Sequence, residues 1–194
     1  MFYLAAEYFL QAYSLPLIAE VKFQKDYFSE YPEQIRVGSD AYDGLRLRTA
    51  VFYTRKSGYY AIHYNQPRTL ATGAILQLND GKIAIFPGEP NESEQGTLTP
   101  IYTLQPNGSL AVPTGLVFIR FAKGVDVKSQ REVINRAGYE IVESLDYAPH
   151  TAWLRAQSGN IADAIARIPQ LEVIPKVENI ELQMLMERGF RLGR

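Results

Sequence analysis

Histidine, cysteine and carboxylate side chains are the groups that most often carry chemistry, and this chain offers few of them at useful spacing. It contains no cysteine and only two histidines, His63 and His150, neither with a second ligand at helical spacing. Thiol catalysis, disulfide bonds, cysteine-ligated metals and multi-histidine metal sites are therefore excluded. The carboxylates Glu140 and Glu143 are interpreted as solvated charges, because nothing in the sequence indicates an apolar pocket around them.

Motifs that mark catalytic or nucleotide-binding loops are also missing. The sequence has no GxGxxG, no P-loop and no GxSxG nucleophile elbow. We therefore expect a non-catalytic protein without a cofactor. An enzyme that uses His63 or His150 is the least favoured alternative.

Composition and charge narrow the choice of partners. The 194 residues are 46% hydrophobic and 21% charged, with a net charge of -1, which is typical of a globular protein without affinity for nucleic acid or anionic membrane. The first 19 residues are apolar but lack the basic residues of a signal peptide, and no apolar run reaches about 20 residues. A cytoplasmic location follows as the expectation, and the oligomeric state stays open.

Two domains are expected, in an α+β protein. Residues 1–112 should form an antiparallel β barrel or sandwich preceded by a helix with Phe2 and Leu10 on one face, because short strands alternate with turn signals such as Asn79-Asp-Gly81. Tyrosines and arginines are interspersed there. They could stack on a small ligand or a peptide, or simply be half-buried strand residues.

The second domain, residues 115–183, should have the order strand, helix, strand, strand, helix, strand. A Pro113-Thr-Gly115 break precedes the first strand, Leu116 to Phe121, while Asp126 and Asn160 are helix N-caps and Pro169 is a stop signal. The remaining strands are expected over 139–145, 151–156 and 175–181. This order predicts a ferredoxin-like βαββαβ sheet with both helices on one face.

Particular residues in this domain carry a family resemblance. The strand ending in Phe121, the helix ending in Ala137-Gly138 and the motif Pro175-x-Val177-x-x-Ile180-Glu181 resemble the subtilisin prodomain and the related stand-alone subtilisin inhibitors. The resemblance covers about a third of the chain. It implies that the sheet face without helices docks on two surface helices of a subtilisin-like serine protease, and that the tail after the last strand enters its substrate cleft. The chain would bind, inhibit or help fold that protease.

The resemblance also implies which residues would contact the protease. Strand alternation places five residues on the bare face: Leu116, Phe118, Arg120, Trp153 and Arg155. Four more candidate contacts lie at the end of the domain and in the tail of residues 184–194: Glu181, Gln183, Leu185 and Met186. Glu181 would cap protease helices, whereas Gln183 replaces a second acidic residue of the family. Two alternatives stay open: the N-terminal half covers the bare face, or the tail is a frayed C-terminus that packs on the chain.

Overall fold

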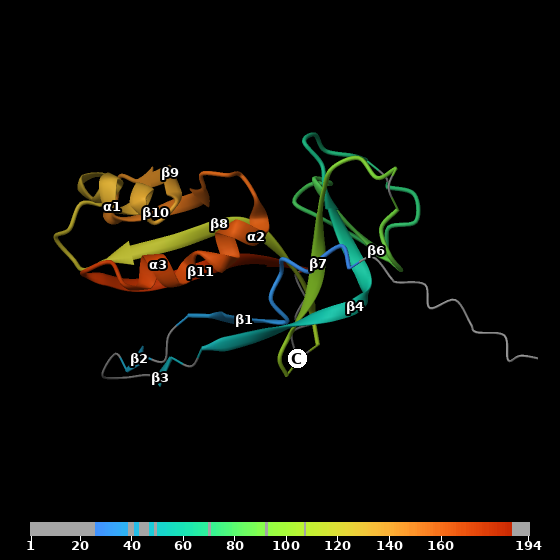
Figure 1. Cartoon of the computed structure of the whole chain (residues 1–194), viewed down its shortest axis with the longest axis horizontal. Helices are drawn as coiled ribbons and strands as arrows, with labels where there is room; N and C mark the ends of the chain where they lie inside the picture. Colours follow the sequence, from blue (N-terminus) through green and yellow to red (C-terminus); the bar gives the residue numbers. More distant parts are fainter. Residues whose placement is uncertain are drawn as a thin grey trace, which may run out of the picture.

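The computed structural model describes residues 26–38, 41–42, 47–48, 50–69, 71–91, 93–106 and 108–187 (Figure 1). The helix expected around Phe2 to Leu10 and the end of the expected tail lie outside these ranges. The described elements, in chain order, are β1 Gln34–Val37, β2 Ala41–Tyr42, β3 Leu47–Arg48, β4 Val51–His63, β5 Leu76–Leu78, β6 Ile83–Pro87, β7 Thr97–Leu104, β8 Leu110–Phe121, the 3₁₀ helix η1 Val127–Gln130, α1 Arg131–Arg136, β9 Tyr139–Leu145, β10 Ala148–Ala156, α2 Ile161–Ala166, α3 Ile168–Glu172 and β11 Val177–Met186.

Nine of the described strands form one open sheet. Its order is β5-β6-β4-β7-β8-β10-β9, with β1 beside β4 and β11 beside β8, and β2 pairs with β3 separately. The expected barrel or sandwich is wrong, because the strands of the N-terminal half do not close on themselves. Instead β7 pairs with the start of β8, whose second half pairs with β10, so the sheet runs on from one half of the chain into the other.

Strand β8 crosses the break expected at Pro113-Thr-Gly115. The neighbouring strand β11 pairs with it on both sides of that point, from Val177 opposite Phe121 to Met186 opposite Ala111. Gly115 keeps the strand intact there: its φ of +80° suits glycine, and a Cβ would lie 3.0 Å from the Cγ1 atom of Ile161 in α2. The irregularity seen in the sequence is thus absorbed within a strand rather than forming a linker.

Two further stop signals act differently from expectation. The sequence predicts a turn at Ser57-Gly58 between strands over 45–53 and 59–64, but this pair lies inside β4, at a register shift opposite β7, so one bent strand replaces the two. Pro169 does not end α2. It lies in the first turn of α3, where the amide hydrogen that proline lacks would have had no partner.

Other local predictions are confirmed. Asn79 and Asp80 have positive φ angles in the β5–β6 hairpin, as the turn signal requires. Asp126 caps η1 by accepting a hydrogen bond from the Lys128 amide, and Asn160 caps α2 by accepting one from the Ala162 amide, both at 2.8 Å. The expected order of strands and helices over the last third is also found.

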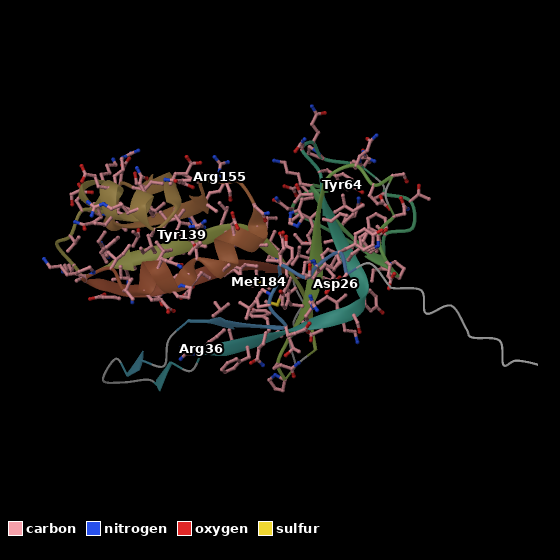
Figure 2. All side chains as sticks on the ribbon, viewed as in Figure 1. Asp26, Arg36, Tyr64, Tyr139, Arg155 and Met184 are labelled. Carbon is pink, nitrogen blue, oxygen red and sulfur yellow. The ribbon has the colours of Figure 1, made fainter. Side chains whose placement is uncertain are left out.

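The larger core lies between β8–β11 and the helices, which Figure 1 shows in front of these strands, and it continues to Ile35 of β1, Tyr53 of β4 and Tyr102 of β7. Tyr139 is fully buried there and donates a hydrogen bond of 2.5 Å to the Ala164 carbonyl, and burial raises its pKa (Figure 2). A smaller core lies on the other side of β8, where Val112 packs with Ile83 and Ile85 of β6. Among the described residues, no helix is long and apolar enough to cross a lipid bilayer.

Candidate functional site

The two faces of the C-terminal strands differ sharply in burial. Val117, Ile119 and Leu154 are fully buried beneath the helices. Their neighbours Phe118 and Trp153 face the opposite way and are only half-buried. The sheet therefore has one closed side and one side that the described elements leave partly exposed.

We call the second side the open face. Cross-strand pairing defines its members, because residues opposite each other in an antiparallel pair point to the same side of the sheet. They are Leu116, Phe118 and Arg120 of β8, Thr151, Trp153 and Arg155 of β10, Glu140 and Glu143 of β9, and Asn179 and Glu181 of β11.

The alternative that the N-terminal half covers this side holds for one end of it. Leu110 and Val112, at the start of β8, pack against β6. Farther along β8 the described residues provide no such cover, and Leu116 and Phe118 stay half-buried. A partly exposed apolar surface thus begins at Leu116, beyond the part of β8 that packs against the N-terminal half of the sheet.

An aromatic pair occupies the centre of the open face. The rings of Phe118 and Trp153 are edge to face, with centroids 5.3 Å apart and planes at 62°. Such pairs favour each other beyond the area they bury, so each ring holds the other in place. The result is a preformed, partly exposed apolar surface on two paired strands.

The cations on the open face are already paired. Arg155 donates to the Glu140 carboxylate at 3.1 Å and 2.5 Å, and the Arg120 Nε atom lies 3.6 Å from the Glu178 carboxylate. Because these arginines are neutralised within the chain, Arg155 is a weaker candidate for an ionic contact with a partner than its sequence position indicated.

Glu181 and Gln183 have different surroundings. Glu181 is exposed, lies opposite Phe118 and accepts a hydrogen bond from the Asn179 side chain at 2.8 Å. The Gln183 Oε1 atom instead accepts a hydrogen bond of 2.8 Å from the Thr114 hydroxyl, across the register shift between β11 and β8. This contact was missed in the sequence, where only the loss of an acidic residue at position 183 was noticed. No local sequence signal marks this contact, because it depends on the pairing of β11 with β8.

Leu185 and Met186 do not begin a free tail. They are the last residues of β11, paired with Val112 and Ala111 of β8, and they pack against the smaller and the larger core respectively. The prediction of a tail from residue 184 is therefore wrong for its first three residues. Figure 2 shows Met184, the first of them, where β11 passes the N-terminal half. The strand extends because β8 begins at Leu110, before the Pro113-Thr-Gly115 break, and offers an edge to residues 184–186.

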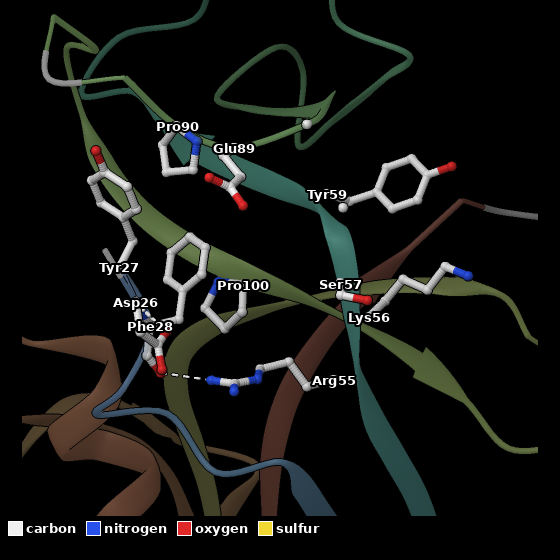
Figure 3. Close-up of a pocket in the computed structure, with 12 residues that line it drawn as sticks. Asp26, Tyr27, Phe28, Arg55, Lys56, Ser57, Tyr59, Glu89, Pro90 and Pro100 are labelled. Carbon is white, nitrogen blue, oxygen red and sulfur yellow. Dashed lines mark hydrogen bonds between the residues drawn. The ribbon is translucent and has the colours of Figure 1, made fainter. Parts of the chain in front are cut away.

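The tyrosine-rich half contains a pocket of about 330 Å³ (Figure 3). Tyr27 and Phe28 line one side, Ser57 and Tyr59 of β4 the other, and Glu89 lies in the loop above. The chain fixes one wall by a hydrogen bond of 2.8 Å from the Arg55 guanidinium to the Phe28 carbonyl, drawn in Figure 3.

Cation–π contacts do occur among the tyrosines. The Arg68 guanidinium lies 4.3 Å from the centroid of the Tyr64 ring, and the Lys56 ammonium lies 5.9 Å from that of Tyr59. Burial and a hydrogen bond to Glu94 raise the pKa of Tyr60 to about 12. These tyrosines are used within the fold, and binding of a ligand by them stays a prediction.

The two histidines are not brought together. His63 lies in β4 and His150 in β10, with β7 and β8 between them. Among the described residues, no three His, Asp or Glu side chains gather as a metal site would require. The His63 Nε2 atom lies 3.0 Å from the hydroxyl of the buried Thr99, and burial lowers the pKa of His63 to about 4.

This environment makes stability depend on pH. In the unfolded chain His63 takes up a proton below about pH 6.5, whereas in the folded chain it does so only near pH 4. Between these two pH values protonation favours the unfolded chain, so the free energy of unfolding decreases as the pH falls from 6.5 to 4. The loss should be at most about 3 kcal/mol. Urea unfolding of the wild type and of His63→Gln, which keeps a polar group near Thr99 but cannot titrate, should diverge between pH 6.5 and 4. If the free energies of unfolding of the two proteins stayed parallel over this pH range, the prediction would be contradicted. Their difference at pH 7.5, where His63 is neutral in both states, measures the effect of the changed packing alone.

Comparison of the chain with protein-family models, with curated proteins and with solved structures found no match.

Proposed function

We propose that this chain is a non-catalytic protein-binding module, and that its open face docks on a subtilisin-like serine protease. The observation that carries the proposal is the partly exposed Phe118–Trp153 pair on a sheet side that the described helices do not cover. Interfaces concentrate their binding energy in tryptophan, tyrosine and arginine side chains near their centres, and large apolar surfaces are seldom left in water.

The choice of a protease rests on the residues that resemble the subtilisin prodomain. We infer a ferredoxin-like unit of residues 115–183, which the antiparallel order β11-β8-β10-β9 and the helices on one side support. Glu181, in the motif that carries the resemblance, lies on the open face beside Phe118. Binding would inhibit the protease or help it to fold. A cytoplasmic location stays a prediction that cell fractionation would test.

The proposal is tested by titrating the purified protein into several subtilisins. Calorimetry with a protease whose catalytic serine is replaced by alanine measures binding without digestion, and hydrolysis of a peptide substrate by the active enzyme measures inhibition. We expect saturable binding with one protein per protease. The absence of any binding heat at micromolar concentrations across the panel would reject the proposal.

A second candidate function is binding of a small ligand or a peptide in the pocket of Figure 3. Its volume of about 330 Å³ lies in the range of small-molecule sites, and Tyr27 and Phe28 provide aromatic surface. In that case the C-terminal unit is only a scaffold. Phe28→Ala would then abolish ligand binding found by thermal-shift screening while leaving protease titrations unchanged.

A further inference from the structure

Two sides of the pocket in Figure 3 are held in place by backbone hydrogen bonds. On one side the Phe28 amide donates a hydrogen bond of 3.0 Å to the Asp26 carboxylate, next to the carbonyl that the chain also fixes. On the other side the Gly88 amide donates one of 2.8 Å to the Gly58 carbonyl in β4, directly before Glu89. The aromatic wall and the start of the loop that carries Glu89 are therefore positioned before any ligand binds.

The apolar lining of this pocket is aromatic. The rings of Tyr27 and Phe28 have centroids 6.5 Å apart and planes at 52°, and the Phe28 ring is edge to face with Tyr31, at a centroid distance of 6.1 Å. Pro90 and Pro100 complete the apolar lining. The faces of aromatic rings carry partial negative charge, which attracts a cation within about 6 Å. The wall therefore suits a positively charged group better than a negatively charged one.

The charged groups around the pocket point to the same sign. The Arg55 guanidinium forms an ion pair with Glu33, and the Lys56 ammonium lies over a tyrosine ring and points away from the pocket in Figure 3. Glu89 is exposed, and no described residue forms an ion pair with it. Figure 3 shows its carboxylate and the Phe28 ring pointing toward each other. The cations at this pocket are thus engaged within the chain, whereas the Glu89 carboxylate is available to a partner of opposite charge.

We propose that this pocket binds an organic cation, an ammonium group on a short apolar body, with the ammonium between the Glu89 carboxylate and the Phe28 ring. This inference rests on the second candidate function and is independent of protease docking. An ammonium group is attracted by a carboxylate and by an aromatic face alike, whereas an anion would be repelled by Glu89 and Asp26. The volume of about 330 Å³ leaves room for the apolar body. Both a free amine and the lysine side chain of a peptide carry this group.

The test compares probes with the same apolar body and different charge: phenethylammonium, the neutral phenethyl alcohol and the anionic hydrocinnamate. Dissociation constants come from chemical-shift changes of the Phe28 and Gly88 amides in the isotope-labelled protein. We expect the ammonium to bind about tenfold more tightly than the alcohol, and hydrocinnamate to bind more weakly than both. A capped tripeptide with a central lysine is titrated in parallel. Tighter binding of the tripeptide identifies a peptide as the source of the ammonium, and tighter binding of phenethylammonium identifies a free amine.

Charge variants assign the effect to one carboxylate. Glu89→Gln should weaken the binding of phenethylammonium about fivefold and leave that of phenethyl alcohol unchanged, because the substitution removes the charge and keeps the shape. The matched control is Glu172→Gln, an exposed carboxylate in α3 outside the pocket, which should alter neither affinity. An equal loss for Glu172→Gln would show that only the overall charge matters, and the proposal would be overturned.

The outcomes also separate this inference from the function on which it rests. Equal affinities for phenethylammonium and phenethyl alcohol, or tighter binding of hydrocinnamate, would overturn the choice of a cation and leave the pocket a ligand site. The absence of shifts at Phe28 and Gly88 with every probe would also reject the cation. A thermal-shift screen without any hit would then reject the second candidate function as well.

Discussion

Alanine in place of Trp153 or Phe118 should weaken binding to a subtilisin-like protease by at least about 30-fold, while the free energy of unfolding changes little. Truncation of a central aromatic anchor typically costs 2 kcal/mol or more of binding free energy, which is about 30-fold in affinity. Each ring is only partly exposed and packs edge to face against the other ring, at a centroid distance of 5.3 Å. The part of each ring that stays exposed is the apolar surface that a partner would cover.

The measurement combines calorimetric titration of each variant against the serine-inactivated protease with urea unfolding of the same samples. Val173→Ala is the matched control, because Val173 is 79% exposed and precedes β11 outside the open face. It should leave the affinity unchanged. Unaltered affinity for both aromatic variants would show that any protease contact lies elsewhere. A loss in proportion to lowered stability would mean that the rings act through folding.

Local patterns predicted the C-terminal half well. The Ile161–Ala166 helix was predictable because apolar residues repeat at helical spacing after the Asn160 cap. Strand β9 was predictable because Tyr139, Ile141 and Val142 favour strands and lie between Gly138 and a turn. Alternation along β8 also predicted which side chains face the helices. These features depend on neighbours within a few residues, and tertiary contacts did not override them.

The connection between the two halves could not be predicted from such patterns. Pro113 and Gly115 are ordinary break signals, yet β11 pairs across them and α2 packs against Gly115. The same long-range pairing fixed Leu185 and Met186 in the sheet and brought Gln183 to Thr114. A continuous strand between residues 110 and 121 requires a partner about 70 residues away, which local sequence does not reveal. The division into domains of residues 1–112 and 115–183 stays a prediction.

The open face was predictable only in part, because strand alternation assigns the residues of one strand to a face, but long-range pairing decides which residues of different strands lie side by side. Residues on one strand, such as Phe118 and Arg120, were assigned to a common face from the period of two alone. The side-by-side arrangement of Glu143, Trp153, Phe118 and Glu181 needed the register of three strand pairs, one of which contains a bulge between Glu143 and Ile141. One residue of slippage would have moved Glu143 to the helix side.

Phe121→Ala should lower the free energy of unfolding by about 3–5 kcal/mol, the largest stability loss expected for a single substitution in β8. Phe121 is fully buried in the core beneath the helices and lies opposite Val177 of β11. Its removal leaves a cavity that the surrounding strands and helices fill only partly. Domains of this size are typically stable by only about 5–15 kcal/mol, so a large part of the population could unfold at physiological temperature.

Phe118→Ala is the natural comparison, because the same substitution three residues earlier on the same strand alters the open face instead of the closed one. Urea unfolding followed by far-UV circular dichroism should give a loss several times larger for Phe121 than for Phe118. Similar losses would mean that chain outside the described residues covers Phe118, and the docking proposal would fail with that result. The ratio of the two losses therefore measures how open the open face is, because both side chains have the same size and only their cover differs.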